Sequence, residues 1–168
     1  MPNYTAPVKD MMFLYEKLRD NQNYNELEKY KEVNPELVKD ILEEAAKINQ
    51  NLILPLAKTG DENPAILENG VVRTPPGYKE AYQKYIEDGW TSLSCDPKYG
   101  GQGMPRTVSA FFDEMISSAS LAFKLYSELT LGAYNCIHHH ATDEIKEKYL
   151  PKMVCLLYTS DAADDAHG

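Results

Sequence analysis

A long series of apolar residues with helical spacing constrains the fold of this chain more than any other feature. Asn34 and Pro35 form a standard helix start, because asparagine caps a first turn and proline suits the first helical position. Pro55, near the end of the series, is expected to bend or end the helix. Steps of three and four place six residues on one face, which predicts a long helix with a buried stripe: Leu37, Ile41, Ala45, Ile48, Leu52 and Leu56.

Most of the remaining chain also has a helical pattern. Residues 121–140 are apolar on so many faces that we expect them in the middle of the fold. Residues 59–77 differ, because they are rich in proline and glycine, and the ENGV sequence predicts a β-hairpin near residues 65–73. The fold class is therefore all-α, a helical bundle with one small hairpin. Further helices are predicted after Pro7 (with Met11, Leu14, Tyr15 and Leu18 on one face), near Tyr78, at Pro105, and from a Thr142 cap to Pro151.

Composition excludes several classes of function. The net charge is −9 at pH 7, so the chain lacks the basic surface that binding to nucleic acid requires. The longest apolar stretch, NLILPLA, is far shorter than the roughly 20 residues that cross a bilayer, and the N-terminus does not resemble a secretion signal. Cys95, Cys136 and Cys155 lack the spacing of a metal or redox pair, which favours a reduced, cytoplasmic protein.

Two groups of polar residues suggest metal sites, but their spacing argues against a bound metal. The histidines at 138–140 are adjacent, and neighbours on a helix point about 100° apart, so the three cannot converge on one ion. Asp161, Asp164 and Asp165 lack the glycine and the closing glutamate of a calcium loop. We therefore expect a polar helix end at the histidines, a solvated tail at the aspartates, and no metal.

The stretch SCDPKYGGQGMP, residues 94–105, contains three glycines in four residues. A glycine-rich loop can hold a phosphate, but the GK[ST] ending of a P-loop is missing and no strand precedes the loop. The alternative is a tight turn before Pro105, which Gly100, Gly101 and Gly103 allow because they have no Cβ. The sequence favours the turn.

Glu114 is a further candidate, because it lies between Phe112 and Met115 at the edge of an apolar helix face. Burial raises the pKa of a carboxyl group and can make it a catalytic base. A structural contact or a place in a pocket wall is the more common role of such a residue.

A longer series of motifs resembles a known family. DGWTSLSCDPKYGGQGMP, residues 88–105, is followed by DEMISSAS, LTLGAYNCIHHHAT and EIKEKYLPKM. Together these segments resemble the N-terminal helical domain of the FAD-dependent acyl-CoA dehydrogenases, in its extended bacterial branch. The likeness runs from about Tyr4 to Val154, although His140-Ala141 replaces the His-Gly of the family. The matching residues are Trp90, Tyr99, Gly100, Gly101, Gly103, Glu114, His140, Lys148, Tyr149, Leu150 and Pro151.

The resemblance implies a chemistry for the parent enzyme, which is expected to be a homo-oligomer. In the family, a glutamate removes the α-proton of a fatty acyl-CoA, FAD accepts the β-hydrogen as hydride, and an electron-transfer flavoprotein reoxidises the flavin. The N-terminal domain supplies neither that base nor a flavin-binding motif, and it walls the acyl-chain cavity beside the flavin. By this match, Glu114, Leu131 and Gly132 lie near the closed end of the cavity, and the glycine-rich stretch is a structural turn.

The resemblance also divides the chain. Residues 1–33 are an N-terminal extension, residues 34–154 are the family domain, and residues 155–168 form a disordered, non-family tail that resembles translated adapter sequence. We therefore expect a fragment of an acyl-CoA dehydrogenase that is inactive alone. The alternative is a self-standing helical module that binds a ligand or a protein without catalysis. A fragment should leave an apolar helix face uncovered, whereas a module should cover it.

Overall fold

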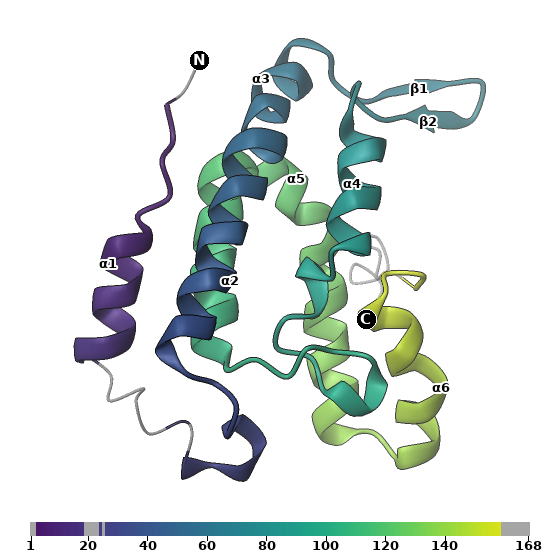
Figure 1. Cartoon of the computed structure of the whole chain (residues 1–168). Coiled ribbons are helices and arrows are strands. Elements are labelled where there is room, and N and C mark those ends of the chain that lie inside the picture. Colours follow the sequence, from purple (N-terminus) through teal and green to yellow (C-terminus); the bar gives the residue numbers. More distant parts are fainter. Residues whose placement is uncertain (1–2, 19–23, 25, 159–168) are drawn as a thin grey trace.

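The computed structural model describes residues 3–18, 24 and 26–158 of the chain. It confirms the all-α fold with one hairpin (Figure 1). The predictions about Asp161, Asp164 and Asp165 lie outside the described residues. The helices are α1 (Val8–Phe13), α2 (Pro35–Ile48), α3 (Leu54–Glu62), α4 (Tyr78–Glu87), α5 (Arg106–His140) and α6 (Asp143–Val154), with short π turns at Leu14–Leu18 and Asn49–Ile53 and 3₁₀ turns at Glu28–Tyr30, Trp90–Ser92 and Pro97–Tyr99.

The helix α2 begins as predicted, because the Asn34 side chain accepts a hydrogen bond from the Leu37 N–H at 2.8 Å. Its buried face is rotated from the predicted stripe. Of the predicted residues only Ala45 and Leu56 are buried, and the others lie half-buried beside the stripe. The buried residues are Val38, Leu42, Ala45, Asn49, Ile53 and Leu56.

Pro55 does not end this helix, although it cannot donate a backbone hydrogen bond. A π turn at Asn49–Ile53 precedes it, and the helix continues as α3. Local π geometry is one way in which a long helix accommodates an interrupted hydrogen-bond ladder. In α1 and the turn after it, Met11 and Tyr15 are buried as predicted, whereas Leu14 is exposed.

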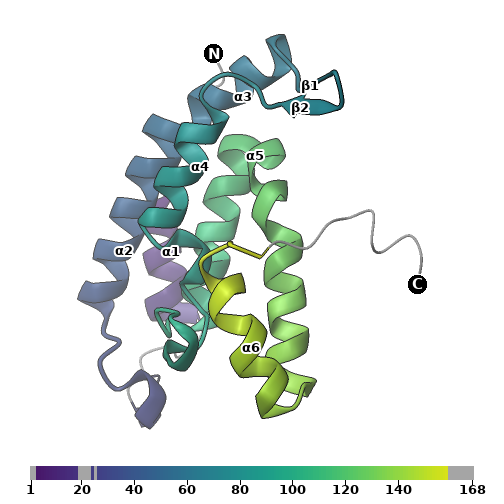
Figure 2. The same ribbon diagram turned by 90° about the vertical axis from the view of Figure 1, so that its right-hand side faces the viewer.

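The helix α5 folds back on itself at Ser120, where φ is −161° and ψ is 99°. The Ser120 hydroxyl accepts a hydrogen bond from the Phe123 N–H at 3.3 Å and so caps the second half. Both views show the two halves side by side and antiparallel (Figures 1 and 2). The first half packs against α2 and α3.

The second half of α5 does not lie in the middle of the fold, so that prediction was wrong. One face holds Phe123 and Tyr134, which are buried against the rest of the domain. The other face is uncovered, and Leu121 and Leu125 are each 56% exposed. The apolar residues on both faces therefore have different environments, which their sequence pattern does not distinguish.

The hairpin forms as predicted, with β1 (Ile66–Glu68) antiparallel to β2 (Val71–Arg73). Asn69 and Gly70 connect the strands with φ of 52° and 77°, as the favoured two-residue turn requires. All residues of the two strands are exposed, and the hairpin projects from the helices (Figure 1).

The last helix, α6, begins after Thr142 as predicted, although the Thr142 side chain makes no capping hydrogen bond. Its predicted end at Pro151 was wrong, because α6 continues to Val154. The residues after Pro151 are held by packing, since Met153 and Val154 join a buried cluster with Cys95, Tyr99, Tyr134 and Leu150. No helix in the described part of the chain is long and apolar enough to cross a membrane.

Candidate functional site

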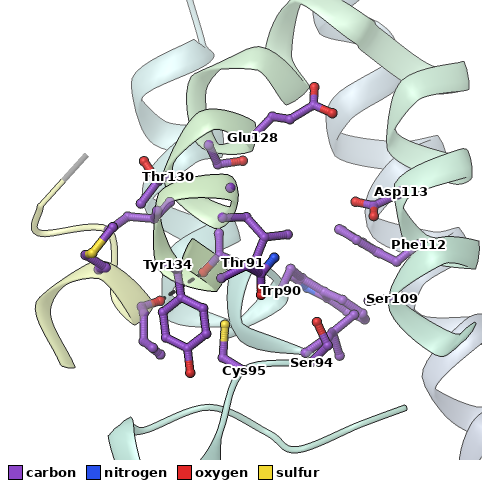
Figure 3. Close-up of a pocket in the computed structure, with 18 of the residues that line it drawn as sticks. Trp90, Thr91, Ser94, Cys95, Ser109, Phe112, Asp113, Glu128, Thr130 and Tyr134 are labelled. Atoms are coloured by element: carbon purple, nitrogen blue, oxygen red, sulfur yellow. Dashed lines mark hydrogen bonds between the residues drawn. The ribbon is translucent and has the colours of Figure 1, made fainter. Parts of the chain in front are cut away.

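A cavity of about 220 Å³ lies between the two halves of α5, the segment after α4 and the end of α6 (Figure 3). The break at Ser120 creates this arrangement, because it turns residues of the second half toward those of the first. Figure 3 shows Asp113 and Phe112 across the cavity from Glu128 and Thr130. The Thr91 hydroxyl donates to the Val154 carbonyl at 3.2 Å and joins α6 to the cavity wall.

Aromatic rings form the apolar part of the wall. The Trp90 and Phe112 rings are stacked, with centroids 5.0 Å apart and planes at 9°, and Tyr85 stacks on Phe112 at 6.0 Å. The Trp90 Nε1 atom is buried, and it has no hydrogen-bond partner among the described residues. The wall therefore combines a rigid apolar surface with an unpaired donor.

Charged side chains occupy the opposite part of the wall. Lys124 Nζ lies 3.1 Å from Glu128 Oε1, and the Lys124 side chain is only 15% exposed. Burial raises the pKa of the Asp113 carboxyl group, and the positive charges of Lys124 and Arg106 oppose this effect. Asp113 is thus a partly desolvated acid facing a lysine–glutamate pair.

Replacement of Asp113 by asparagine should make stability less dependent on pH. The raised pKa means that folding favours the protonated carboxyl group, so its contribution to stability is lost as pH rises through the folded-state pKa. The stability of Asp113→Asn relative to the wild type should therefore increase above about pH 4. Urea unfolding at a series of pH values measures this, with Asp61→Asn on the exposed face of α3 as the control. A constant difference between Asp113→Asn and the wild type would contradict the prediction.

The glycine-rich stretch makes a tight turn beside the cavity. Gly100 and Gly103 have φ of 95° and 67°, and a Cβ on Gly101 would collide with the Cys95 backbone carbonyl. The N–H groups of the four residues 100–103 donate to the backbone carbonyls of Pro97, Asp96, Ser92 and Cys95, at 2.9 to 3.1 Å. These four donors are therefore already in use, which argues against a phosphate site formed by this backbone.

The histidines end α5 as a polar segment. His138 Nε2 lies 3.1 Å from Asp96 Oδ2, and the His138 ring stacks on Tyr134 with centroids 5.6 Å apart. Within the described residues, no group of three or more histidine, cysteine or acidic side chains is placed to hold a metal ion. All three cysteines are free thiols.

Comparison with known proteins identifies the family of this helical domain. Residues 35–155 match the family described as "Acyl-CoA dehydrogenase, N-terminal domain". The chain belongs to the acyl-CoA dehydrogenase family. The sequence resemblance in the glycine-rich stretch and the helices that follow is thereby confirmed at the level of the family.

The chain is similar in sequence to three acyl-CoA dehydrogenases of known name. A 3-methylmercaptopropionyl-CoA dehydrogenase of Ruegeria pomeroyi is 38% identical over 90% of this chain. A butyryl-CoA dehydrogenase of Syntrophomonas wolfei is 29% identical over 90%. A broad-specificity linear acyl-CoA dehydrogenase of Mycobacterium tuberculosis is 26% identical over 88%. The chain spans about a quarter of the length of these relatives, with coverage of 26%, 25% and 24% respectively.

Of the three wall residues that the family resemblance suggested, the structure brings two to the cavity. Leu131 and Gly132 line it, whereas Glu114 is exposed and lies away from it. Burial raises the pKa of the Tyr4 phenol and the Glu114 charge adds to this effect, so Glu114 lies toward the N-terminal segment. The preceding residue, Asp113, faces the cavity instead, because one step along a helix turns a side chain by about 100°.

The family implies FAD, but neither the cavity between the two halves of α5 nor the glycine-rich turn forms a site for it. The cavity, at about 220 Å³, is smaller than the roughly 300–1,000 Å³ of typical ligand pockets. The N–H groups of residues 100–103 are also already paired with backbone carbonyls of residues 92–97. We therefore assign no flavin-binding residue in this domain.

Proposed function

We propose that this chain is the N-terminal domain of an acyl-CoA dehydrogenase and that it forms one wall of the acyl-chain site. The cavity between the two halves of α5, in a domain of this family, carries the proposal. The whole enzyme would oxidise the α,β carbon–carbon bond of an acyl-CoA with FAD and pass electrons to an electron-transfer flavoprotein. It would act as a homo-oligomer in the cytoplasm, where the three free thiols would stay reduced.

The size and chemistry of the cavity support a short acyl chain. Its volume is about 220 Å³, and Asp113, Lys124 and Glu128 give it a charged end that a long alkyl chain would desolvate without compensation. Two of the relatives are named for short acyl groups, 3-methylmercaptopropionyl and butyryl. We propose a short acyl group, with or without a heteroatom, as the substrate class.

An uncovered apolar surface supports a domain of a larger enzyme over a self-standing module. Leu121, Leu125 and Leu129 are exposed at helical spacing on the second half of α5. The hairpin adds exposed Leu67 and Val72. A module that acts alone covers such surface, whereas a domain leaves it for the partner domains against which it packs.

Substitution of Leu131 by phenylalanine tests the acyl-chain site in the whole enzyme that contains this domain. The larger ring should fill part of the cavity and lower kcat/KM for the longest linear acyl-CoA that the wild type accepts. We expect about a tenfold loss, because one methylene in an apolar pocket changes discrimination by roughly 10- to 200-fold. Reduction of an electron acceptor, measured across a series of linear acyl-CoAs, gives these values.

Leu27→Phe is the matched control, because Leu27 is exposed and lies outside the cavity. It should leave the chain-length profile unchanged. An equal effect of both substitutions would reject the placement of the acyl chain. If the whole enzyme dehydrogenates no acyl-CoA, the proposed activity itself fails.

A further inference from the structure

A second cavity, of about 450 Å³, adjoins the first, and the two share the wall residues Ser94, Arg106, Tyr134 and Asn135. The fold-back at Ser120 produces it, because the start and the end of α5 return to the same end of the domain (Figure 1). Arg106 comes from the start of α5, and His138 and His139 come from its end. The acyl-CoA dehydrogenase proposal makes no use of this cavity.

The lining of this cavity is basic, in contrast to the chain as a whole. The net charge of the chain is −9 with histidine counted as neutral, yet on the same basis the wall has two positive charges, Lys29 and Arg106, against one carboxylate, Asp96, with the imidazoles of His138 and His139 beside them. These basic side chains come from the N-terminal segment and from both ends of α5, so the tertiary fold assembles the cluster. A local excess of positive charge of this kind attracts anions.

The single carboxylate is already engaged. Asp96 Oδ1 accepts the Lys98 N–H at 2.9 Å, and Asp96 Oδ2 lies 3.1 Å from His138 Nε2. The Lys98 N–H lowers the pKa of Asp96, as do His138 and, more weakly, Lys29. Lys29 and His138 therefore both stabilise the charged form of the Asp96 carboxylate. Arg106 has no such role at Asp96; its charge acts on Asp113 and Cys95, and its guanidinium is a fork-shaped donor in the wall that the two cavities share.

Neutral donors complete the wall. Ser94 and Asn135 line the cavity beside Arg106. The Tyr134 hydroxyl accepts the Asp96 N–H at 2.9 Å and is also hydrogen-bonded to the Cys95 thiol, so its O–H is not counted among the donors to a ligand. Guanidinium, ammonium and hydroxyl groups around one space match the oxygens of a phosphate, because an arginine fork binds two of them and a lysine adds a point charge.

We propose that this second cavity binds a phosphate dianion, either free or at the end of a small monoester. Arg106 and Lys29 supply the charge, and Ser94 and Asn135 supply hydrogen bonds. The volume of about 450 Å³ lies within the roughly 300–1,000 Å³ of small-ligand sites, so a monoester with a small organic group is accommodated. The inference does not rest on the proposed acyl-chain function, although Ser94 and Arg106 also line the first cavity.

Isothermal titration calorimetry of the full 168-residue chain tests this site at low ionic strength, with inorganic phosphate and glycerol 3-phosphate as probes. Saturable binding of at least one probe is expected, with acetate at matched ionic strength binding more weakly. If glycerol 3-phosphate binds more tightly, the ligand of this cavity is a phosphate monoester. If inorganic phosphate binds more tightly, the ligand is the free phosphate ion. Arg106→Gln and Lys29→Gln should each weaken binding about tenfold, because each removes a charge-assisted contact.

Two further variants serve as controls of opposite kinds. Lys58→Gln removes an exposed charge that pairs with Glu62 at 3.4 Å on α3, and it should leave phosphate affinity within about twofold. Asp96→Asn should strengthen binding, because it removes the one negative charge in the wall while an amide can still accept the Lys98 N–H. Urea unfolding verifies that each variant is folded. If Arg106→Gln does not fold, the phosphate affinity of Lys29→Gln alone tests the site. Absence of saturable phosphate binding, or an equal loss in Lys58→Gln and Lys29→Gln, overturns the proposal.

Discussion

Replacement of Gly101 by alanine is expected to destabilise the domain by about 3 kcal/mol, since a new methyl group would overpack a rigid site. Its Cβ would meet the Cys95 carbonyl carbon and oxygen, which are backbone atoms of the same turn. These atoms cannot move freely, because the Cys95 carbonyl also accepts the Gly103 N–H at 2.9 Å. The turn would have to open, and with it the connection between the segment after α4 and the start of α5. Urea unfolding followed by circular dichroism measures the loss.

Gly132→Ala is the matched control for this substitution. A Cβ built on Gly132 has no atom within 4 Å apart from its chain neighbours and the nearby backbone of its own helix, and this glycine lies inside the second half of α5. Alanine there should stabilise the helix by about 0.5–1 kcal/mol, because glycine loses more backbone entropy on folding. Equal effects of the two substitutions would show that the close approach at Gly101 does not constrain the turn.

The local signals in the sequence correctly predicted that the helices and the hairpin form. They were less accurate about which face of a helix is buried and where a helix ends. The Asn34 cap and the Asn69-Gly70 turn were predicted correctly, because each depends on residues adjacent in the chain. The buried stripe of α2 was misplaced by a rotation, since Val38 and Asn49 give no stronger pattern than the residues beside them. Pro55 was predicted to bend or end its helix and Pro151 to end its helix, yet the chain stays helical past both, through a π turn before Pro55 and through packing after Pro151.

The residues of the candidate site could not be predicted from hydrophobic periodicity, because the site depends on which helices pack together. The family resemblance suggested Glu114 for the acyl-chain cavity, which stays a prediction, whereas the cavity in this structure has Asp113 in its wall. The sequence does not show which of the adjacent carboxylates, Asp113 or Glu114, faces a neighbouring helix. That depends on the break at Ser120, which brings the second half of α5 beside the first. Lys124 and Glu128 were also overlooked, although their spacing of four is a recognised signal for an ion pair. The sequence showed that pair only as a feature of one helix, not as part of a wall.

Replacement of Phe123 by alanine should cost about 3–5 kcal/mol, the usual loss when a buried aromatic side chain is truncated. Phe123 is 1% exposed, and its ring lies 5.7 Å from that of Tyr78 and 5.8 Å from that of Tyr85. It therefore joins the second half of α5 to α4 immediately after the break at Ser120. Loss of this ring should loosen the fold-back on which both cavities depend. Urea unfolding of the 168-residue chain measures the effect.

Leu125→Ala separates the two faces of the same helix. Leu125 is 56% exposed, so its truncation should change the stability of this chain by less than about 0.5 kcal/mol. A loss as large as that of Phe123→Ala would show that the outer face is covered within the chain, which is what a self-standing module requires. In the whole enzyme the expectation reverses, because the domains that follow would pack on this face and Leu125→Ala would then lower stability. A neutral result in the chain and a loss in the whole enzyme would together identify the outer face of α5 as an interface between domains.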